Sequence, residues 1–395
     1  MKYFLICVLI FSVGQTQAEA DETSLCKFWS YPKGNVSTWN RECNRVGTYS
    51  AIETVFPHNA VEARKPQTIP NSATKILTAD FPFIDRKGGR WTLGRYLAEH
   101  RVMAFMVVRD NEIAYETYQY GRSREMLFLS HSMSKTILSL LYGIAISEGL
   151  ISLNTKVADV LPEFASSAWA SDTVYHLLRM TPSARLVNSY VDHADNSYTN
   201  PMNNNVDPAG YLARKKGPFL DGSVFHYNGA VTAVLGYMLK ARLNGRTIAQ
   251  YMEEKLWTPM GGESRAVVIR DTVGNEGVQG QMAATVRDYA KLGALMVNKG
   301  RALDGTQVVP QAWIESMVKQ ERSKAQPTNG ALYGLHVWLA QAGGGRGFFS
   351  GTHGQYIFFD PSSSTVIVQI GAAKDAEDSA GIDRIFPLRN ALNDW

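Results

Sequence analysis

The order of the expected strands and helices constrains the fold of this chain more than any other feature. Two short strands around a turn are expected early, in "MAFMVVRDNEIAYETY" (103–118). Strands return late, in "YGLHVWLA", "GQYIFFD" and "TVIVQIG", and mostly helical sequence lies between them. We therefore predict an α+β fold, an α/β sandwich, whose antiparallel sheet is built from N- and C-terminal strands. Helices flank this sheet, and a large, mostly helical insertion spans about 150–300.

The helices of this chain are predicted from apolar periodicity and from their end signals. An apolar helix follows Lys135, and further helices are expected in "SDTVYHLLRM", "AVTAVLGYMLKARL", "TVRDYAKLGALMVNKG" and about 380–393. The stretch 182–222 is dense in Asn, Asp, Pro and Gly and is expected to form long loops. Such loops often shape a substrate cleft, which we expect between the sheet and the helical insertion.

The first twenty residues differ from the rest of the chain. Lys2 is followed by the apolar run "YFLICVLIFSV" and by the small-x-small sequence Ala18-Glu19-Ala20, which together predict a signal peptide (1–20). The mature chain is expected to be exported, periplasmic or secreted. No later stretch reaches the roughly 18 apolar residues that a spanning helix needs. The net charge of +4 is too mild to indicate a nucleic-acid partner.

Two cysteines remain after removal of the signal peptide, which contains Cys7. Cys26 and Cys43 form an even count in an oxidising compartment, so a disulfide is expected, with two buried free thiols as the alternative. It would close a loop in residues 21–90, an N-terminal extension wrapped on the main domain of residues 91–395. No CxxC, HExxH or EF-hand pattern occurs, so no metal is predicted, and no cofactor is implied.

A Ser-x-x-Lys pair, Ser132 and Lys135, stands where the long apolar helix begins. Positions i and i+3 share one helix face, so the lysine amine can reach the serine hydroxyl. A serine needs a base to become a nucleophile, and lysine serves as that base when desolvation lowers its pKa. The same spacing also occurs at Ser24–Lys27, Ser30–Lys33, Ser72–Lys75 and Ser316–Lys319. The alternative for Ser132 is a helix N-cap beside a solvated lysine.

Two later segments could complete a site. "FHYNGA" places Tyr227 on a loop before a helix, where its hydroxyl could relay a proton; the alternative is a core aromatic. "SGTHGQ" (350–355) combines small residues with His353 beside a strand. One amide of this segment could pair with the Ser132 N–H as an oxyanion hole. For His353, a structural or substrate-contacting histidine is favoured over a Ser-His pair.

Together these motifs resemble the serine beta-lactamase and penicillin-binding-protein superfamily. "GLISLNTKVADVLPEF", "TVYHLLRMTPSARL" and "QMAATVRDYAKLGALMVNKGRALDG" look like the class C beta-lactamase-like branch, and within it the 6-aminohexanoate-dimer hydrolase type. The resemblance covers about residues 90–393. An alpha/beta-hydrolase would need Gly-x-Ser-x-Gly, which does not occur here.

The resemblance implies a role for each motif residue. Ser132 would be the acylated nucleophile, Lys135 its base and Tyr227 the proton relay. The amides of Ser132 and Thr352 would form the oxyanion hole. Tyr190, in the loop after "LLRMTPSARL", is an expected substrate contact.

This sequence departs from the superfamily pattern at two motifs. The usual Tyr-x-Asn is here Tyr227-Asn228-Gly229, and no lysine stands in 347–355, where one normally holds a substrate carboxylate. We expect Asn228, His353 and Gly354 to contact substrate, with His353 as a weaker, pH-dependent charge.

The expected function is that of an exported serine hydrolase acting through an acyl-enzyme on small esters or amides. The alternatives are a beta-lactamase or D,D-peptidase, against which the missing lysine argues, and an inactive binding protein on the same fold, against which the intact Ser, Lys and Tyr argue.

Overall fold

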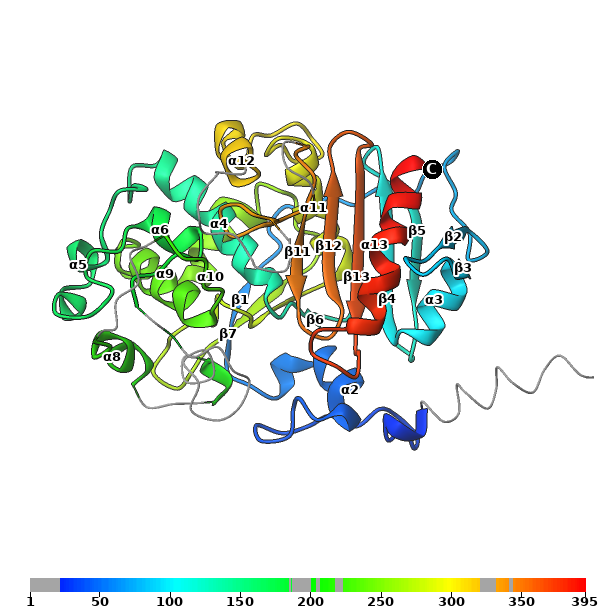
Figure 1. The fold of residues 1–395 in the computed structure, drawn as a ribbon, viewed down its shortest axis with the longest axis horizontal. Helices are drawn as coiled ribbons and strands as arrows, with labels where there is room; N and C mark the ends of the chain where they lie inside the picture. The colour runs from blue at the N-terminus through cyan, green and yellow to red at the C-terminus, as the bar shows by residue number, and fades with distance from the viewer. Residues whose placement is uncertain are drawn as a thin grey trace, which may run out of the picture.

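One seven-stranded antiparallel sheet organises the molecule. The computed structural model describes residues 22–184, 186, 200–203, 207–216, 223–319, 332–340 and 344–395. Every pairing in the sheet is antiparallel. In spatial order its strands are β5 (Glu112–Tyr118), β4 (Val102–Arg109), β13 (Thr365–Gly371), β12 (Gln355–Asp360), β11 (Gly347–Gly351), β10 (Trp338–Leu339) and β9 (Leu332–Tyr333). The prediction of one sheet built from both parts of the chain is confirmed, because β4 pairs directly with β13 (Figure 1).

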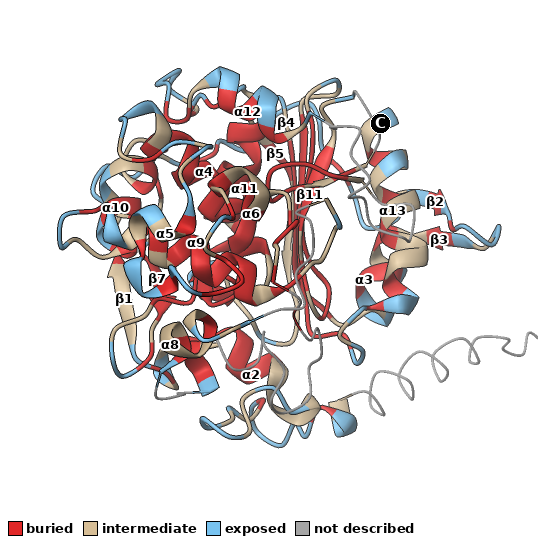
Figure 2. Cartoon of the chain, turned by 60° about the vertical axis from the view of Figure 1, so that its left-hand side comes forward, coloured by how far each residue is buried: buried red, intermediate tan, exposed pale blue. Residues whose placement is uncertain are grey.

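Both faces of this sheet are covered. On β4, Phe105 and Val107 belong to one apolar cluster, whereas Met106 and Val108 belong to the other. This period-two division follows from the alternation of side chains along a strand. Figure 2 shows the strands nearly edge-on, with α3 (Leu93–Glu99) and α13 (Ser379–Asp394) on one side. On the other side lie α4 (Met133–Ser147), α9 (Gly229–Ala241) and α11 (Val286–Val297).

The helices expected from the sequence coincide with α4, α9, α11, α13 and the short helix α6. Helix α11 ends at Val297, shortly before Gly300, whose φ of 82° suits glycine. The remaining helices are short: α2 (Arg45–Tyr49), α5 (Val157–Val160), α6 (Val174–Leu178), α8 (Pro208–Ala213), α10 (Ile248–Met252) and α12 (Gln311–Met317). Single helical turns lie at Glu42–Asn44, Ile52–Thr54, Pro162–Phe164, Pro201–Asn203 and Glu253–Trp257.

A second sheet interrupts the region that the sequence predicted as mostly helical. It has four antiparallel strands: β1 (His58–Val61), β7 (Ala266–Ile269), β8 (Met282–Ala284) and β6 (Phe128–Leu129). A two-stranded sheet joins β2 (Pro82–Ile84) and β3 (Arg90–Thr92) in the N-terminal part. These strands have two to four residues each, too few for a period-two pattern to be recognised.

The predicted strand 333–340 is broken in the structure. Tyr333 ends β9 and Trp338 begins β10, with a bend between them. At the bend His336 has a φ of 56°, and its N–H donates to Leu178 O at 2.8 Å. The backbone of His336 therefore bonds to the helical region instead of extending a strand.

The N-terminal extension packs against the main body of the protein. Cys26 and Cys43 form a disulfide. In α2, Arg45 Nη1 donates to the carbonyls of Ala373 at 2.8 Å and Lys374 at 2.7 Å. These bonds join the extension to the chain that follows β13.

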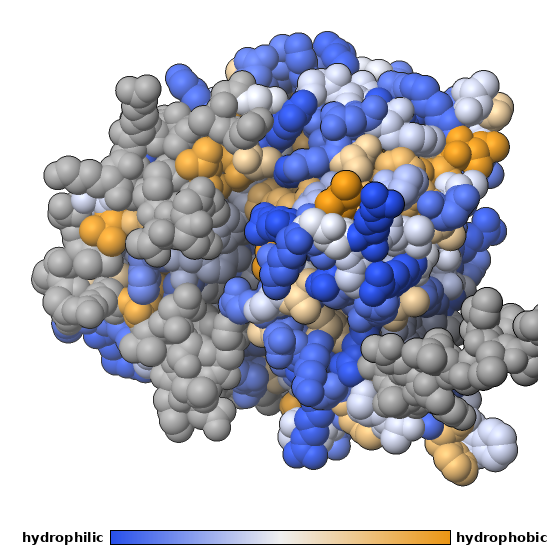
Figure 3. All heavy atoms as spheres, turned by 45° about the vertical axis from the view of Figure 1, so that its right-hand side comes forward, coloured by the Kyte–Doolittle hydropathy of each residue, from blue (hydrophilic) through white to orange (hydrophobic). Residues whose placement is uncertain are grey.

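The outer surface carries few large apolar groups. Among the coloured atoms of the face drawn in Figure 3, hydrophilic side chains predominate and the hydrophobic ones form small separate patches. Within the described ranges, no helix is both long and apolar enough to cross a membrane.

Gly143 tests the packing of α4 against α12. A β-carbon at Gly143 would lie 2.2 Å from Trp313 Cδ1, and Trp313 is fixed because its Nε1 donates to Ser139 O at 2.9 Å. We expect Gly143→Ala to lower the free energy of unfolding by about 1–3 kcal/mol through overpacking. Urea titration measures this, with Ser147→Ala on the exposed side of α4 as the control, expected within about 0.5 kcal/mol of wild type. Equal stability of the two variants would contradict the close packing.

Candidate active site

The turn between β6 and α4 carries Ser132. The chain leaves β6, Ser130 N–H donates to Met282 O at 2.7 Å, and α4 begins at Met133. Ser132 occupies the N-cap position, yet its side chain makes no capping hydrogen bond. The hydroxyl therefore does not serve the helix as a cap, unlike the usual N-cap serine.

Lys135 provides the partner of that hydroxyl. Its Nζ lies 2.8 Å from Ser132 Oγ and also donates to Gln279 O. Helix α4 is buried from Met133 to Ala145, so the lysine is only 4% exposed. Burial lowers the Lys135 pKa to about 7, because an ammonium group loses its hydration there. The alternative of an N-cap serine beside a solvated lysine does not fit this geometry.

Tyr227 lies against the same lysine. Lys135 Nζ is 5.3 Å from the centroid of the Tyr227 ring. The next residue, Asn228, is fully buried, and its Oδ1 accepts from Ala230 N–H at 2.8 Å as the cap of α9. This cap fixes the loop that carries Tyr227. The structure thus brings Ser132, Lys135 and Tyr227 together, whereas the Oδ1 of Asn228 serves the helix.

The end of β11 approaches the start of α4 very closely. A β-carbon at Gly351 would lie 2.6 Å from Ser130 O and 2.9 Å from His131 Cβ. Glycine is therefore required for this contact between strand and helix. Gly351 pairs with Gln355, and residues 352–354 form the loop between β11 and β12. Thr352, the expected second oxyanion donor, follows directly on Gly351 beside the Ser132 segment.

His353 is buried and uncharged. Its Nδ1 lies 2.9 Å from Ala373 O, and burial, with Arg45 nearby, lowers its pKa to about 4. The imidazole is therefore neutral at neutral pH and does not supply the pH-dependent charge that the sequence suggested. Gly354 has a φ of 86°, as the tight loop requires. Tyr190 lies outside the described residues.

Several residues near the site were not predicted from the sequence. The His131 ring packs against those of Trp39, Tyr49 and His353. The aromatic residues of "CKFWSYPKGNVSTWNREC" are the sequence signal that could have indicated Trp39. Gln279 accepts from Lys135 through its backbone carbonyl, which no residue pattern reveals.

An aromatic wall stands beside Tyr227. The Trp338 ring centroid is 5.4 Å from that of Tyr227, and Tyr333 lies 6.1 Å away. Trp338 remains partly exposed. This side of the site is therefore lined by aromatic rings.

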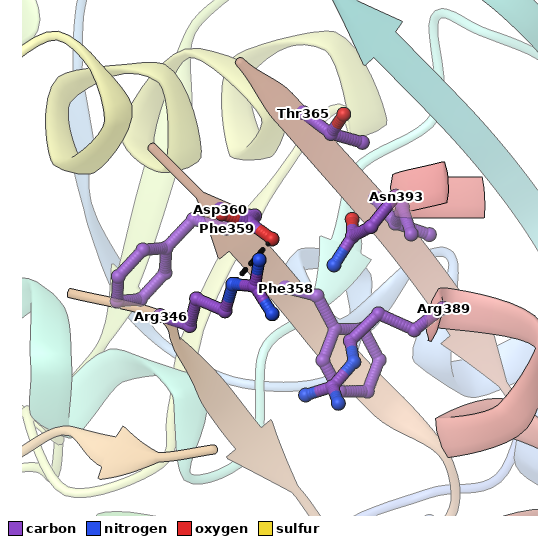
Figure 4. A pocket seen from close by; sticks show the side chains of 8 residues that line it. Arg346, Phe358, Phe359, Asp360, Thr365, Arg389 and Asn393 are labelled. Atoms are coloured by element: carbon purple, nitrogen blue, oxygen red, sulfur yellow. Dashed lines mark ion pairs between the residues drawn. The ribbon is translucent and has the colours of Figure 1, made fainter. Parts of the chain in front are cut away.

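Apart from the Ser132 site, a hollow lies beside α13, on the face of the main sheet that α4 does not cover (Figure 4). Arg346 Nε there pairs with Asp360 Oδ2 at 2.8 Å, and Arg389 and Asn393 line the same hollow. It holds no nucleophile paired with a base, so it is not the candidate active site.

In the part of the chain that the structure describes, no group of three or more His, Cys, Asp or Glu could hold a metal ion.

Comparison with known proteins supports the fold family that the sequence motifs resemble. A family model described as Beta-lactamase matches residues 93–384. The 6-aminohexanoate-dimer hydrolase of Paenarthrobacter ureafaciens is 26% identical over 366 residues, covering 87% of this chain and 89% of the relative.

Solved structures agree with this result. A Bacillus anthracis protein assigned to the 6-aminohexanoate-dimer hydrolases superposes with a TM-score of 0.79 at 21% identity. The superposition covers 91% of this chain and 95% of that one. A family VIII carboxylesterase superposes with a TM-score of 0.57 at 17% identity, over 73% and 92% of the two chains. At such identities the structures show a shared fold.

Two buried histidines should make the stability depend on pH. Burial lowers the pKa of His336 to about 3 and that of His353 to about 4, below the usual 6.5. The unfolded chain binds their protons first, so their contribution is complete above about pH 6.5 and is lost as pH falls toward about 4. Each should reduce the free energy of unfolding by up to about 1.4 kcal/mol per pH unit.

Urea unfolding at about pH 7, 6 and 5 tests this dependence. The variant His336→Gln should show a flatter dependence than wild type, because the depressed pKa of His336 no longer contributes. An identical slope in both proteins would contradict the assignment of the proton uptake to this histidine.

Proposed function

The chain belongs to the Beta-lactamase family, and on that premise we propose that it is an exported serine hydrolase acting through an acyl-enzyme on small esters or amides. The 2.8 Å approach of Lys135 Nζ to Ser132 Oγ, at a lysine whose pKa is lowered to about 7, carries the proposal. The amine is then sufficiently deprotonated near neutral pH to take the serine proton.

The reaction begins with the transfer of the Ser132 proton to Lys135. Ser132 Oγ forms a bond to the substrate carbonyl carbon, and the negative oxygen lies between the N–H groups of Ser132 and Thr352. Tyr227 relays the proton held by Lys135 to the departing alcohol or amine as the ester or amide bond breaks. Water then attacks the acyl-enzyme by the reverse proton path, which releases the acid and restores Ser132.

The proposed substrate class rests on the names of the relatives and on the absence of a lysine in residues 347–355. One relative is named for an amide dimer and another as a carboxylesterase, so both bond types are proposed. No lysine stands in 347–355, and His353 is neutral, so a substrate carboxylate gains no charge from this strand. This favours small esters and amides over beta-lactams and D-Ala-D-Ala peptides.

Export is the cellular part of the proposal. The predicted signal peptide (1–20) directs the chain out of the cytoplasm. The disulfide between Cys26 and Cys43 is supporting, because such bonds persist in oxidising compartments.

Substitution of the proposed nucleophile and base should abolish turnover. We expect Ser132→Ala and Lys135→Ala each to lower kcat by more than about 1,000-fold, because the two groups act as one unit. A panel of ester and amide substrates measures this. The matched control is Ser316→Ala, in the Ser316–Lys319 pair, which should retain full activity because Ser316 is exposed on α12.

A fluorophosphonate probe separates the rival functions. A mass increase on the Ser132 peptide is expected, and its absence together with tight ligand binding would indicate an inactive binding protein. Hydrolysis of nitrocefin at the rate of dedicated beta-lactamases would replace the ester and amide proposal by the lactamase alternative.

The activity should follow the protonation of Lys135. The base works only as the neutral amine, so kcat/KM should rise with pH and level off above about 7. Below that pH it should fall about tenfold per pH unit. Measurement with an uncharged ester between about pH 5 and pH 9 tests this, and a flat profile from about pH 6 to pH 8 would contradict the role of Lys135.

A further inference from the structure

We infer that the N-terminal extension belongs to the catalytic apparatus, where its aromatic side chains hold His131 and His353 as positioning residues for the oxyanion hole. This inference rests on the proposed function, since it concerns the two N–H donors of that site. It adds a role for residues that touch neither the substrate nor the nucleophile.

Each proposed oxyanion donor is the direct chain neighbour of one histidine. His131 precedes Ser132, and His353 follows Thr352. The two imidazole rings lie 5.8 Å apart, at an interplanar angle of 56°. One segment begins α4 and the other connects β11 to β12, so the ring contact joins two distant parts of the chain. The distance between the donors therefore depends on this contact.

Both histidines hold an unfavourable backbone conformation. His131 has a φ of 43° and His353 a φ of 62°, a region that residues with a β-carbon seldom adopt. Such conformations persist only where surrounding contacts determine them, and they concentrate at functional sites. The contacts that hold His131 should therefore influence the direction of the Ser132 N–H.

The extension supplies those contacts. The Tyr49 ring lies 4.7 Å from the His131 ring and 6.0 Å from the His353 ring. The Trp39 ring also stacks on that of His131, 6.1 Å away at an interplanar angle of 29°. Trp39 lies within the loop that the disulfide closes. Tyr49 thus touches both histidines at once, and Trp39 supports the one beside the nucleophile.

Hydrogen bonds also hold the Tyr49 and His353 rings in place. Tyr49 Oη donates to Asn40 Oδ1, which holds the phenol ring in place. Ala373 O accepts from Arg45 Nη1 at 2.8 Å and lies 2.9 Å from His353 Nδ1. The carbonyl is therefore shared by the extension and the oxyanion loop. Burial keeps the two imidazoles neutral, so they pack as aromatic rings without mutual repulsion.

Substitutions in the extension test the inference, in the full chain with kcat normalised to sites titrated by a fluorophosphonate. We expect Tyr49→Ala and Trp39→Ala to lower kcat about tenfold while KM stays within about twofold, because oxyanion donors act mainly in the transition state. Tyr49→Phe and Trp39→Phe retain a ring and should restore most of the activity.

The same segment offers a matched control. Trp29 is 89% exposed, so Trp29→Ala removes an aromatic residue from the extension without touching the histidines. It should leave kcat and KM at the wild-type values. Melting curves establish that each variant is folded; where an Ala variant does not fold, Tyr49→Leu and Trp39→Leu decide, because they keep apolar volume but lose the ring.

The outcomes separate this inference from the function on which it rests. Wild-type kcat in the folded Tyr49 and Trp39 variants, or a change in KM alone, would overturn the positioning role while Ser132→Ala remains inactive. Persistent activity of Ser132→Ala would instead refute the proposed function itself. A fall of kcat in Trp29→Ala equal to that in Trp39→Ala would also overturn the inference, since it would indicate a general effect of the extension.

Discussion

The desolvation of one amine sets the chemistry of this protein. Lys135 lies in the first turn of a helix that is buried from Met133 to Ala145, so its ammonium form loses hydration and its pKa falls to about 7. The sheet and the helices contribute to the chemistry only through the environment that they provide. They exclude water from one turn of α4, and the hydroxyl of Ser132 lies within reach of the resulting base.

The sequence predicts the main sheet well because its central strands are long and apolar. β4, β12 and β13 are almost fully buried, and their composition marks them clearly as strands. The short strands of the four-stranded sheet are stabilised by tertiary pairing, and local propensity does not distinguish them. The break at His336 is likewise set by a hydrogen bond to Leu178, far away in the chain.

The residues of the candidate site also divide into those that the sequence predicts and those that depend on tertiary packing. Ser132 and Lys135 can be predicted because one helical turn brings them together wherever the helix lies. Tyr227 needed the resemblance to a family, since its contact with Lys135 depends on the docking of α9 against α4. The neutrality of His353 could not be foreseen, because it depends on the burial of the loop beneath the N-terminal extension.

The pairing of β4 with β13 has a consequence for biosynthesis. Strand β4 pairs with a strand that follows the whole helical region in the chain. A nascent chain therefore exposes one edge of β4 until β13 has been synthesised, and long-range pairing of this kind folds slowly. Delayed folding is compatible with the export proposed above, because a polypeptide has to stay extended while it crosses a translocation pore.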